Sequence, residues 1–303
     1  MLSLSYNKAM KTPKKILSII LTIIAIGCLV GAGYLLVSGI LEDKHSADTL
    51  EALRPSQESA EAADQSTASE AVASGVKQST PPAELTLPTP TPDPRVPNPY
   101  AKAFLANEDM VAWIQIPDTN IDYPVMWTPE DENYYLYRDF DGSDNKNGCL
   151  ILDTDSSLDP LTTNLIIHGH NMRSGAMFGN LTDYEDEEYF ENHKQIILYT
   201  EECQRNYEVI AVFRSQVYKK SAQVFKFYKF FQADTQEEFD DFYNNIKELS
   251  LYDTGVTAEF GDHFLTLSTC VYHVEQGRFV VVAKEVESGG SYLPVQEEEQ
   301  TTK

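Results

Sequence analysis

The sequence is poor in basic residues. Its 303 residues include 23 Lys and Arg against 47 Asp and Glu, which gives a formal net charge of −24. Proteins that bind nucleic acid or dock on an anionic membrane surface need clusters of positive charge. The charge balance therefore argues against both classes of partner.

Several motifs are also missing. The sequence contains no internal repeat, no Gly-rich phosphate loop and no dinucleotide-binding fingerprint, so we predict no nucleotide cofactor. His168 and His170 form an H-x-H pair, which needs further ligands to bind zinc. Since no second cluster of His, Cys or acidic residues stands at ligand spacing, we predict no metal site.

One long uncharged run is present near the N-terminus. Residues 16–41 carry no charged side chain and exceed the ~20 residues that cross a bilayer as a helix. A cleaved signal peptide is the alternative, but its apolar core spans only ~7–15 residues and ends at a small-residue cleavage site, which is not evident here. Because lysines precede the run, the positive-inside rule predicts that residues 1–15 are cytoplasmic and that the rest of the protein is extracellular.

The remaining chain divides by composition. Residues 42–98 are rich in Ser, Ala, Glu, Thr and Pro and contain few large apolar side chains, so we predict a flexible stalk that becomes a stiffer Pro-rich spacer. Residues 99–288 are long enough for one domain with its own core. Residues 289–303 are predicted to form a disordered acidic tail.

Short runs rich in Val, Ile, Tyr and Phe, separated by Asp, Asn, Gly and Pro clusters, fill residues 99–288. This pattern predicts a mainly β domain, a closed β-barrel decorated with a few helices. Helical spacing appears within 174–193 and 235–252, and Asn98 is predicted to cap a short helix that ends near Asn107. The expected strands are 111–116, 121–127, 149–154, 164–170, 194–200, 207–215, 225–231, 263–270 and 278–286.

Four cysteines are too few for a disulfide-stapled extracellular domain. Cys28 lies in the apolar run, which leaves Cys149, Cys203 and Cys270 outside the membrane. An odd number means that at least one thiol is free. Cys149 and Cys203 could be small buried side chains or one disulfide, and the first alternative is slightly favoured.

Cys270 ends one expected strand and Arg278 begins the next. If the two strands pair as an antiparallel hairpin, these residues become neighbours at one end of the sheet. A nearby cation favours the nucleophilic thiolate, and the guanidinium could instead hydrogen-bond the oxyanion formed when a thiolate attacks a carbonyl.

Among the six histidines, His170 is the best candidate for the acid/base partner of such a thiolate. It follows Gly169 at the end of the run "NLIIHGHNM", placed at a strand end as Cys270 is. His273 lies in the loop after Cys270 and could contact substrate. The remaining histidines outside the H-x-H pair are predicted to be surface residues, namely His45, His193 and His263.

From about Asn107 to Val286 the sequence resembles the class B sortases, the membrane-anchored cysteine transpeptidases of Gram-positive bacteria. The resemblance rests on "WIQIPDTNIDYPVM", "YYLYRDFDG", "GCLILDTDSS", "NLIIHGHNMRSGAMFGNL", "LTLSTC" and "RFVVVAKE", with the helical stretch "TQEEFDDFYNNIKEL" before the cysteine strand. One departure is His168, where class B commonly has tyrosine.

The resemblance implies a sortase-type barrel and assigns catalytic roles to Cys270, His170 and Arg278. Substrate contacts are predicted for Asn171, Ser268, Thr269 and His273. It further implies that Cys270 cleaves a C-terminal sorting signal of secreted proteins after Thr, and that an amine of a peptidoglycan precursor or a pilin lysine resolves the acyl-enzyme. No cofactor is implied.

Two other functions use the same residues. An extracellular cysteine peptidase or wall hydrolase would need the same thiolate, imidazole and oxyanion donor, with water as acceptor. A membrane-tethered binding module without catalysis would carry Cys270 as an inert buried thiol.

Overall fold

The described residues of the N-terminal unit form one long helix. The computed structural model describes residues 11–55 and 95–295, and the chain divides after Ala52 into two units. Helix α1 (Lys11–Leu53) exposes large apolar side chains, among them Leu29 and Leu35. Within the described residues it is one helix whose length and composition would allow it to cross a membrane, a property that signal sequences share.

The end of α1 corrects the expected start of the stalk. Residues 42–53 are helical rather than flexible. The segment "EDKHSADTLEAL" contains no Gly or Pro and several good helix formers, so the helix continues beyond the apolar run. The rest of the predicted stalk, from residue 56 to residue 94, lies outside the described residues.

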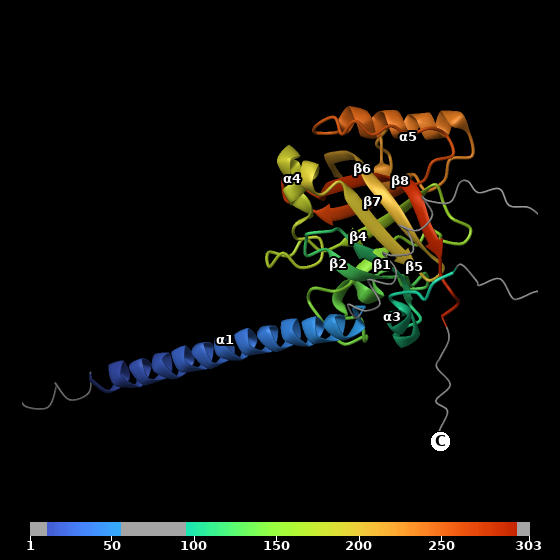
Figure 1. Ribbon diagram of the computed structural model, residues 1–303. Helices are drawn as coiled ribbons and strands as arrows, with labels where there is room; N and C mark the ends of the chain where they lie inside the picture. The colour runs from blue at the N-terminus through green and yellow to red at the C-terminus, as the bar shows by residue number, and fades with distance from the viewer. Residues whose placement is uncertain (1–10, 56–94, 296–303) are drawn as a thin grey trace, which may run out of the picture. The chain divides into compact units, whose positions relative to one another are not determined.

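Eight strands of the second unit close into a barrel, as the strand pattern predicts (Figure 1). Their order around the barrel is β1-β2-β3-β4-β7-β8-β6-β5, and β5 pairs with β1 to close the ring. The strands are β1 (Met110–Gln115), β2 (Asp122–Met126), β3 (Leu150–Leu152), β4 (Asn164–Gly169), β5 (Gln195–Thr200), β6 (Cys203–Gln216), β7 (Phe264–Cys270) and β8 (Gly277–Ser291).

Short helices decorate the barrel. Helices form in both stretches of helical spacing, and α5 begins with a capping box between Thr235 and Glu238. The predicted N-cap was wrong, because Tyr100 occupies the N-cap position of α3. Asn98 Oδ1 accepts from the Tyr100 N–H in the turn before the helix, and its amide donates to the carbonyls of Thr200 and Glu201. The helices are α3 (Ala101–Ala106), η1 (Tyr134–Tyr137), η2 (Leu181–Glu185), α4 (Glu187–Asn192), η3 (Phe227–Lys229) and α5 (Gln236–Leu249).

The aromatic run 225–231 is not a strand, contrary to the prediction. It contains the short helix η3, and its rings pack around α5, with Phe230 stacked on Phe242 at 4.0 Å between ring centroids. The barrel is closed, so its ring has no free edge with which this run could pair.

The predicted tail is partly ordered. Strand β8 continues to Ser291, which pairs with Cys203 of β6, and Tyr292 forms a parallel bridge with Val96. Residues 289–292 therefore belong to the barrel unit rather than to a disordered tail. Residues 296–303 lie outside the described residues.

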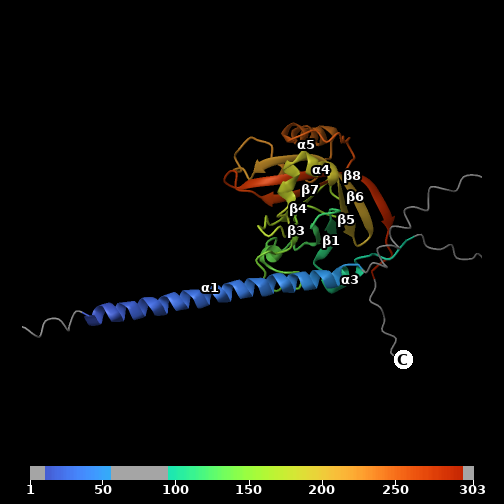
Figure 2. The same cartoon turned by 60° about the vertical axis from the view of Figure 1, so that its left-hand side comes forward.

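Helix α5 covers one side of the barrel (Figure 2). Its buried residues Phe239, Phe242 and Ile246 form a core cluster with Phe264 at the start of β7 and with β8. Along a strand, alternate side chains share a face, so the face of β7 that packs against α5 at Phe264 also carries Cys270 at its other end. This packing fixes the strand on which the candidate nucleophile lies.

Candidate active site

Arg278 lies directly opposite Cys270. Strands β7 and β8 are antiparallel neighbours in which these two residues are register partners, and this confirms the predicted pairing. Both side chains are half-buried. Arg278 Nη1 donates to the carbonyl oxygens of Gly277 at 3.0 Å and Gln276 at 3.3 Å, so the guanidinium is anchored to the hairpin that follows Cys270.

His170 is held by the short helix η1. Its Nε2 lies 2.8 Å from the carbonyl oxygen of Leu136, and its ring packs against Tyr137 at 5.3 Å between centroids. A carbonyl only accepts hydrogen bonds, so Nε2 carries the hydrogen, and in the neutral ring Nδ1 carries the lone pair. This support of His170 by η1 was not predicted from the sequence. The sequence feature that corresponds to these contacts is the aromatic run "NYYLY", which lies far upstream of the histidine.

Two hydrogen bonds join the end of β4 to the end of β7, which run parallel. The Asn171 amide donates to the carbonyl oxygen of Cys270 at 2.9 Å, and the Thr269 hydroxyl donates to the carbonyl oxygen of Gly169 at 2.8 Å. Gly169 is tightly packed, since a Cβ there would lie 2.5 Å from Leu150 Cδ2. Glycine at this position therefore allows β4 to approach its neighbours closely.

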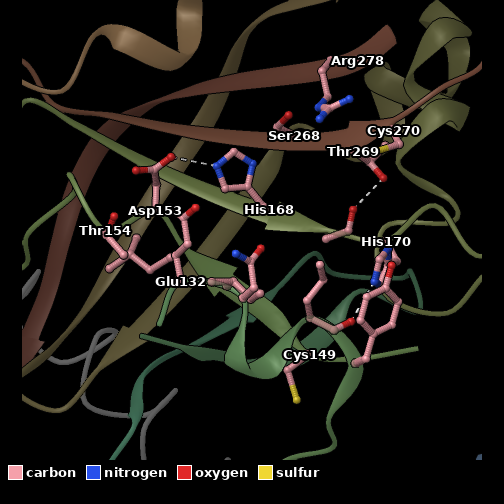
Figure 3. Close-up of a pocket in the computed structure, with 16 residues that line it drawn as sticks. Glu132, Cys149, Asp153, Thr154, His168, His170, Ser268, Thr269, Cys270 and Arg278 are labelled. Carbon is pink, nitrogen blue, oxygen red and sulfur yellow. Dashed lines mark hydrogen bonds and ion pairs between the residues drawn. The ribbon is translucent and has the colours of Figure 1, made fainter. Parts of the chain in front are cut away.

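These strand ends surround one cavity of about 440 Å³ (Figure 3). It is lined by all three predicted catalytic residues and by two of the predicted substrate-contacting residues, Ser268 and Thr269. The other two do not line it: Asn171 binds the backbone of Cys270, and His273 is exposed in the loop before β8. The cavity is completed by residues in or next to η1, β3 and β4, among them Glu132, Tyr137, Cys149, Asp153 and His168.

A second histidine of the cavity is paired with a carboxylate, which the sequence did not reveal. His168 Nε2 lies 2.9 Å from Asp153 Oδ2. Burial opposes ionisation of Asp153, but hydrogen bonds from His168 and from the Asp155 backbone outweigh it and lower the pKa of the Asp153 carboxyl below its usual value. Within the part of the chain that the structure describes, no group of three or more His, Cys, Asp or Glu is placed to hold a metal ion.

All four cysteines lie in the described residues and are unpaired. Cys149 is buried, as the favoured alternative predicts, and Cys203 is half-buried on β6. Burial raises the pKa of the Cys149 thiol, and the carboxylates of Asp139 and Asp141 raise it further. Cys149 therefore remains a thiol at neutral pH, although it lines the same cavity as Cys270.

Comparison with known proteins identifies the family. The family model of the sortase domain matches residues 114–286. The chain belongs to the sortase family. It is 33% identical over 180 residues to Sortase B of Listeria monocytogenes and 29% identical over 188 residues to Sortase B of Staphylococcus aureus, in each case covering 59% of this chain and 70% of the relative.

Solved structures agree with this assignment. Sortase B of Bacillus anthracis in complex with AAEK1 is 31% identical, with a TM-score of 0.54 over 62% of this chain and 84% of that one. The sortase B–substrate complex of Staphylococcus aureus is 26% identical, with a TM-score of 0.57 over 64% and 87% of the two chains. The protein is a class B sortase with the sortase barrel, and thus a cysteine transpeptidase.

Proposed function

We propose that Cys270, His170 and Arg278 perform the sortase reaction on a C-terminal sorting signal of secreted proteins. The supporting observation is that Cys270 and Arg278 are register partners and line a cavity that His170 also lines. In this proposal cleavage follows a threonine. The acyl group then passes to an amine of a peptidoglycan precursor or of a pilin lysine.

In the first step the Cys270 thiolate attacks the threonine carbonyl carbon, and the carbonyl oxygen becomes an oxyanion. Arg278 Nε and Nη2 form no hydrogen bond to the described residues, so they are available to donate to this oxyanion. The C–N bond then breaks, and protonated His170 gives its proton to the leaving amine. The product is a thioester between Cys270 and the threonine carbonyl.

The proposal also places the reaction at the cell surface. An anchor over residues 16–41, preceded by cytoplasmic residues 1–15, would hold the catalytic domain of residues 99–288 outside the membrane, where secreted substrates and lipid-linked acceptors arrive. Helix α1 supports it by length and composition. Labelling of Cys270, which this topology places outside the membrane, tests the topology in intact cells.

The reaction is tested with the full chain in detergent micelles and a panel of peptides carrying LPxTG-, NPxTN- and PPxTG-like signals. Mass spectrometry follows the peptide products and the enzyme mass with and without triglycine. We expect a thioester adduct and an amine-dependent product with the wild type. Cys270→Ala should form neither, while Cys203→Ala, which alters a cysteine outside the cavity, should retain both.

His170→Ala and Arg278→Ala should each lower kcat/KM by about 10²-fold or more, the usual cost of losing an acid/base group or an oxyanion donor. An amine product from the Cys270→Ala variant would contradict the proposal. Release of only the free acid, whatever amine is present, would favour the hydrolase alternative.

A further inference from the structure

The cavity contains a histidine–carboxylate pair in addition to the three residues above. His168 is the penultimate residue of β4, and Asp153 directly follows β3. The two strands are antiparallel neighbours, with Ile151 opposite His168, and this register brings the imidazole to the carboxylate. Both residues line the cavity shared with Cys270.

The pair fixes the protonation pattern of His168. The lowered pKa of Asp153 means that its carboxyl group is ionised at neutral pH and accepts a hydrogen bond. His168 Nε2 therefore carries the hydrogen, and Nδ1 of the neutral ring carries a lone pair that can accept a proton. His170 differs, because its Nε2 faces a neutral carbonyl. The Asp153 carboxylate also fixes the orientation of the His168 ring, as the aspartate of a catalytic triad does for its histidine.

The His168 nitrogen that carries the lone pair faces the part of the cavity lined by Ser268 and Arg278 (Figure 3). Figure 3 shows the ring nitrogen remote from Asp153 on the side where Ser268 and Arg278 lie. His168 and Ser268 are register partners on parallel strands. Cys270 lies two residues further along β7, so strand spacing and rise place its Cα about 8 Å from that of His168. Both residues line the cavity of about 440 Å³, whose volume is sufficient for a small amine.

Ser268 provides a second sign that this space takes a ligand. Its side chain is 2% exposed and lines the cavity, and its Oγ has no hydrogen-bond partner among the described residues. A buried hydroxyl without a partner costs free energy that a bound polar group would recover. The carboxylate of Glu132 lines the same cavity, where it can accept a hydrogen bond from the nitrogen of an entering amine.

We propose that His168, oriented by Asp153, is the general base for the acceptor amine, so that two histidines divide the proton transfers of the reaction. This inference rests on the proposed transpeptidation. His170 serves the leaving amine of the first step. His168 serves the entering primary amine of the second step, which approaches between His168, Ser268 and Cys270.

In the second step, the amine displaces Cys270 from the acyl group. The neutral amine attacks the thioester carbon, a C–N bond forms, and one proton of the amine nitrogen passes to His168 Nδ1. The C–S bond breaks, and its electron pair returns to Cys270 as thiolate. The His168 imidazolium, paired with Asp153, releases its proton to water.

Single-turnover kinetics separate the two steps. The full chain in micelles is mixed with the preferred sorting peptide, and the thioester adduct is followed by mass as it forms and, after addition of triglycine, as it decays. For His168→Gln we expect adduct formation within about twofold of wild type and amine-dependent decay slower by about 10²-fold, the usual share of a general base. Asp153→Asn should also slow decay selectively.

The matched control is His263→Gln. His263 is also near a carboxylate, with its Nδ1 3.9 Å from Glu285, but it directly precedes β7 at the end opposite Cys270. This variant should change neither rate. Such a result would show that the effect belongs to the cavity and not to histidine–carboxylate pairs in general.

Wild-type decay in His168→Gln would overturn the inference, as would equal losses in formation and decay. If His168→Gln fails to fold, Asp153→Asn tests the inference instead, because it keeps the shape of the side chain. The rates of thioester formation and of amine-dependent decay are again compared with those of the wild type. Failure of the proposed function looks different, because the wild type itself would then form no thioester, and both proposals would fall.

Discussion

The imidazole of His170 is anchored to the carbonyl oxygen of Leu136, 2.8 Å away and 34 positions earlier in the chain. Helix η1, which contains Leu136, also supplies Tyr137, whose ring packs on the imidazole. The orientation of the proposed acid/base group therefore depends on a segment outside the strands. Changes that move η1 should therefore alter catalysis even when Cys270, His170 and Arg278 are unchanged.

Gly148→Ala tests this dependence. Gly148 has a φ of +59°, and an added Cβ would overlap the carbonyl oxygen of Leu136, so the carbonyl must move. We expect kcat to fall by about tenfold or more, since small misplacements of catalytic groups are costly. Steady-state kinetics with the sorting peptide measure the effect.

Gly142→Ala is the control for backbone strain. Gly142 also has a positive φ, +82°, but its added Cβ would lie 3.6 Å from Tyr134 Oη. The Gly142→Ala substitution should lower the free energy of unfolding by about 1 kcal/mol and leave kcat near the wild-type value. Equal kcat values for the two variants would show that His170 does not depend on the Leu136 carbonyl.

Cys149 should resist alkylation although it lines the cavity. Its side chain is 4% exposed, and burial raises the pKa of its thiol, so little thiolate forms at neutral pH. We expect iodoacetamide to modify Cys270 long before Cys149 in the folded protein, as peptide mapping by mass spectrometry would show. Urea-unfolded protein is the control, where the two cysteines should react at similar rates. Equal rates in the folded protein would refute this account.

Phe242→Ala should destabilise the barrel unit by about 3–5 kcal/mol, the usual cost of removing a fully buried aromatic ring. Phe242 stacks on Phe230, and its ring centroid lies 5.3 Å from that of Phe264 on β7. Urea unfolding measures the change. Tyr243→Ala removes a neighbouring, half-buried ring of α5 and should cost clearly less. Equal costs would mean that the packing against Phe264 contributes little.

Asp153→Asn should destabilise the fold in a pH-dependent way. The pKa of Asp153 is lower in the folded state than its usual value, so the ionised form adds stability above the unfolded-state pKa of about 3.9. This contribution is lost as the pH falls through the folded-state pKa. The free energy of unfolding should therefore differ most between variant and wild type near neutral pH, and the difference should shrink in acid.

Urea titrations at about pH 7 and about pH 3 measure this difference. The control is Asp155→Asn, because Asp155 is exposed and lies 3.9 Å from Lys229, where an ion pair contributes little. A stability difference for Asp153→Asn that stays constant with pH would show that the carboxylate is not stabilised by His168.

Local sequence determined the elements that depend on short-range physics. The barrel strands follow from side-chain alternation and β-branched residues, and α5 follows from helical spacing. The placement of Cys270 opposite Arg278 was also predictable, because only a short hairpin connection separates them. The motifs of the sortase family lie in these same segments, so class and fold could be assigned from the sequence.

Only the tertiary structure decided which distant segments meet. Barrel closure left no edge for the aromatic run 225–231, which packs against α5 instead. The parallel pairing of β4 with β7 brought His168 beside Ser268, and the pairing of β3 with β4 brought Asp153 to His168. These contacts join residues that are far apart in the chain or lie on different strands. Spacing along a sequence fixes neither register nor the order of strands in a barrel, and the shape of the cavity depends on both.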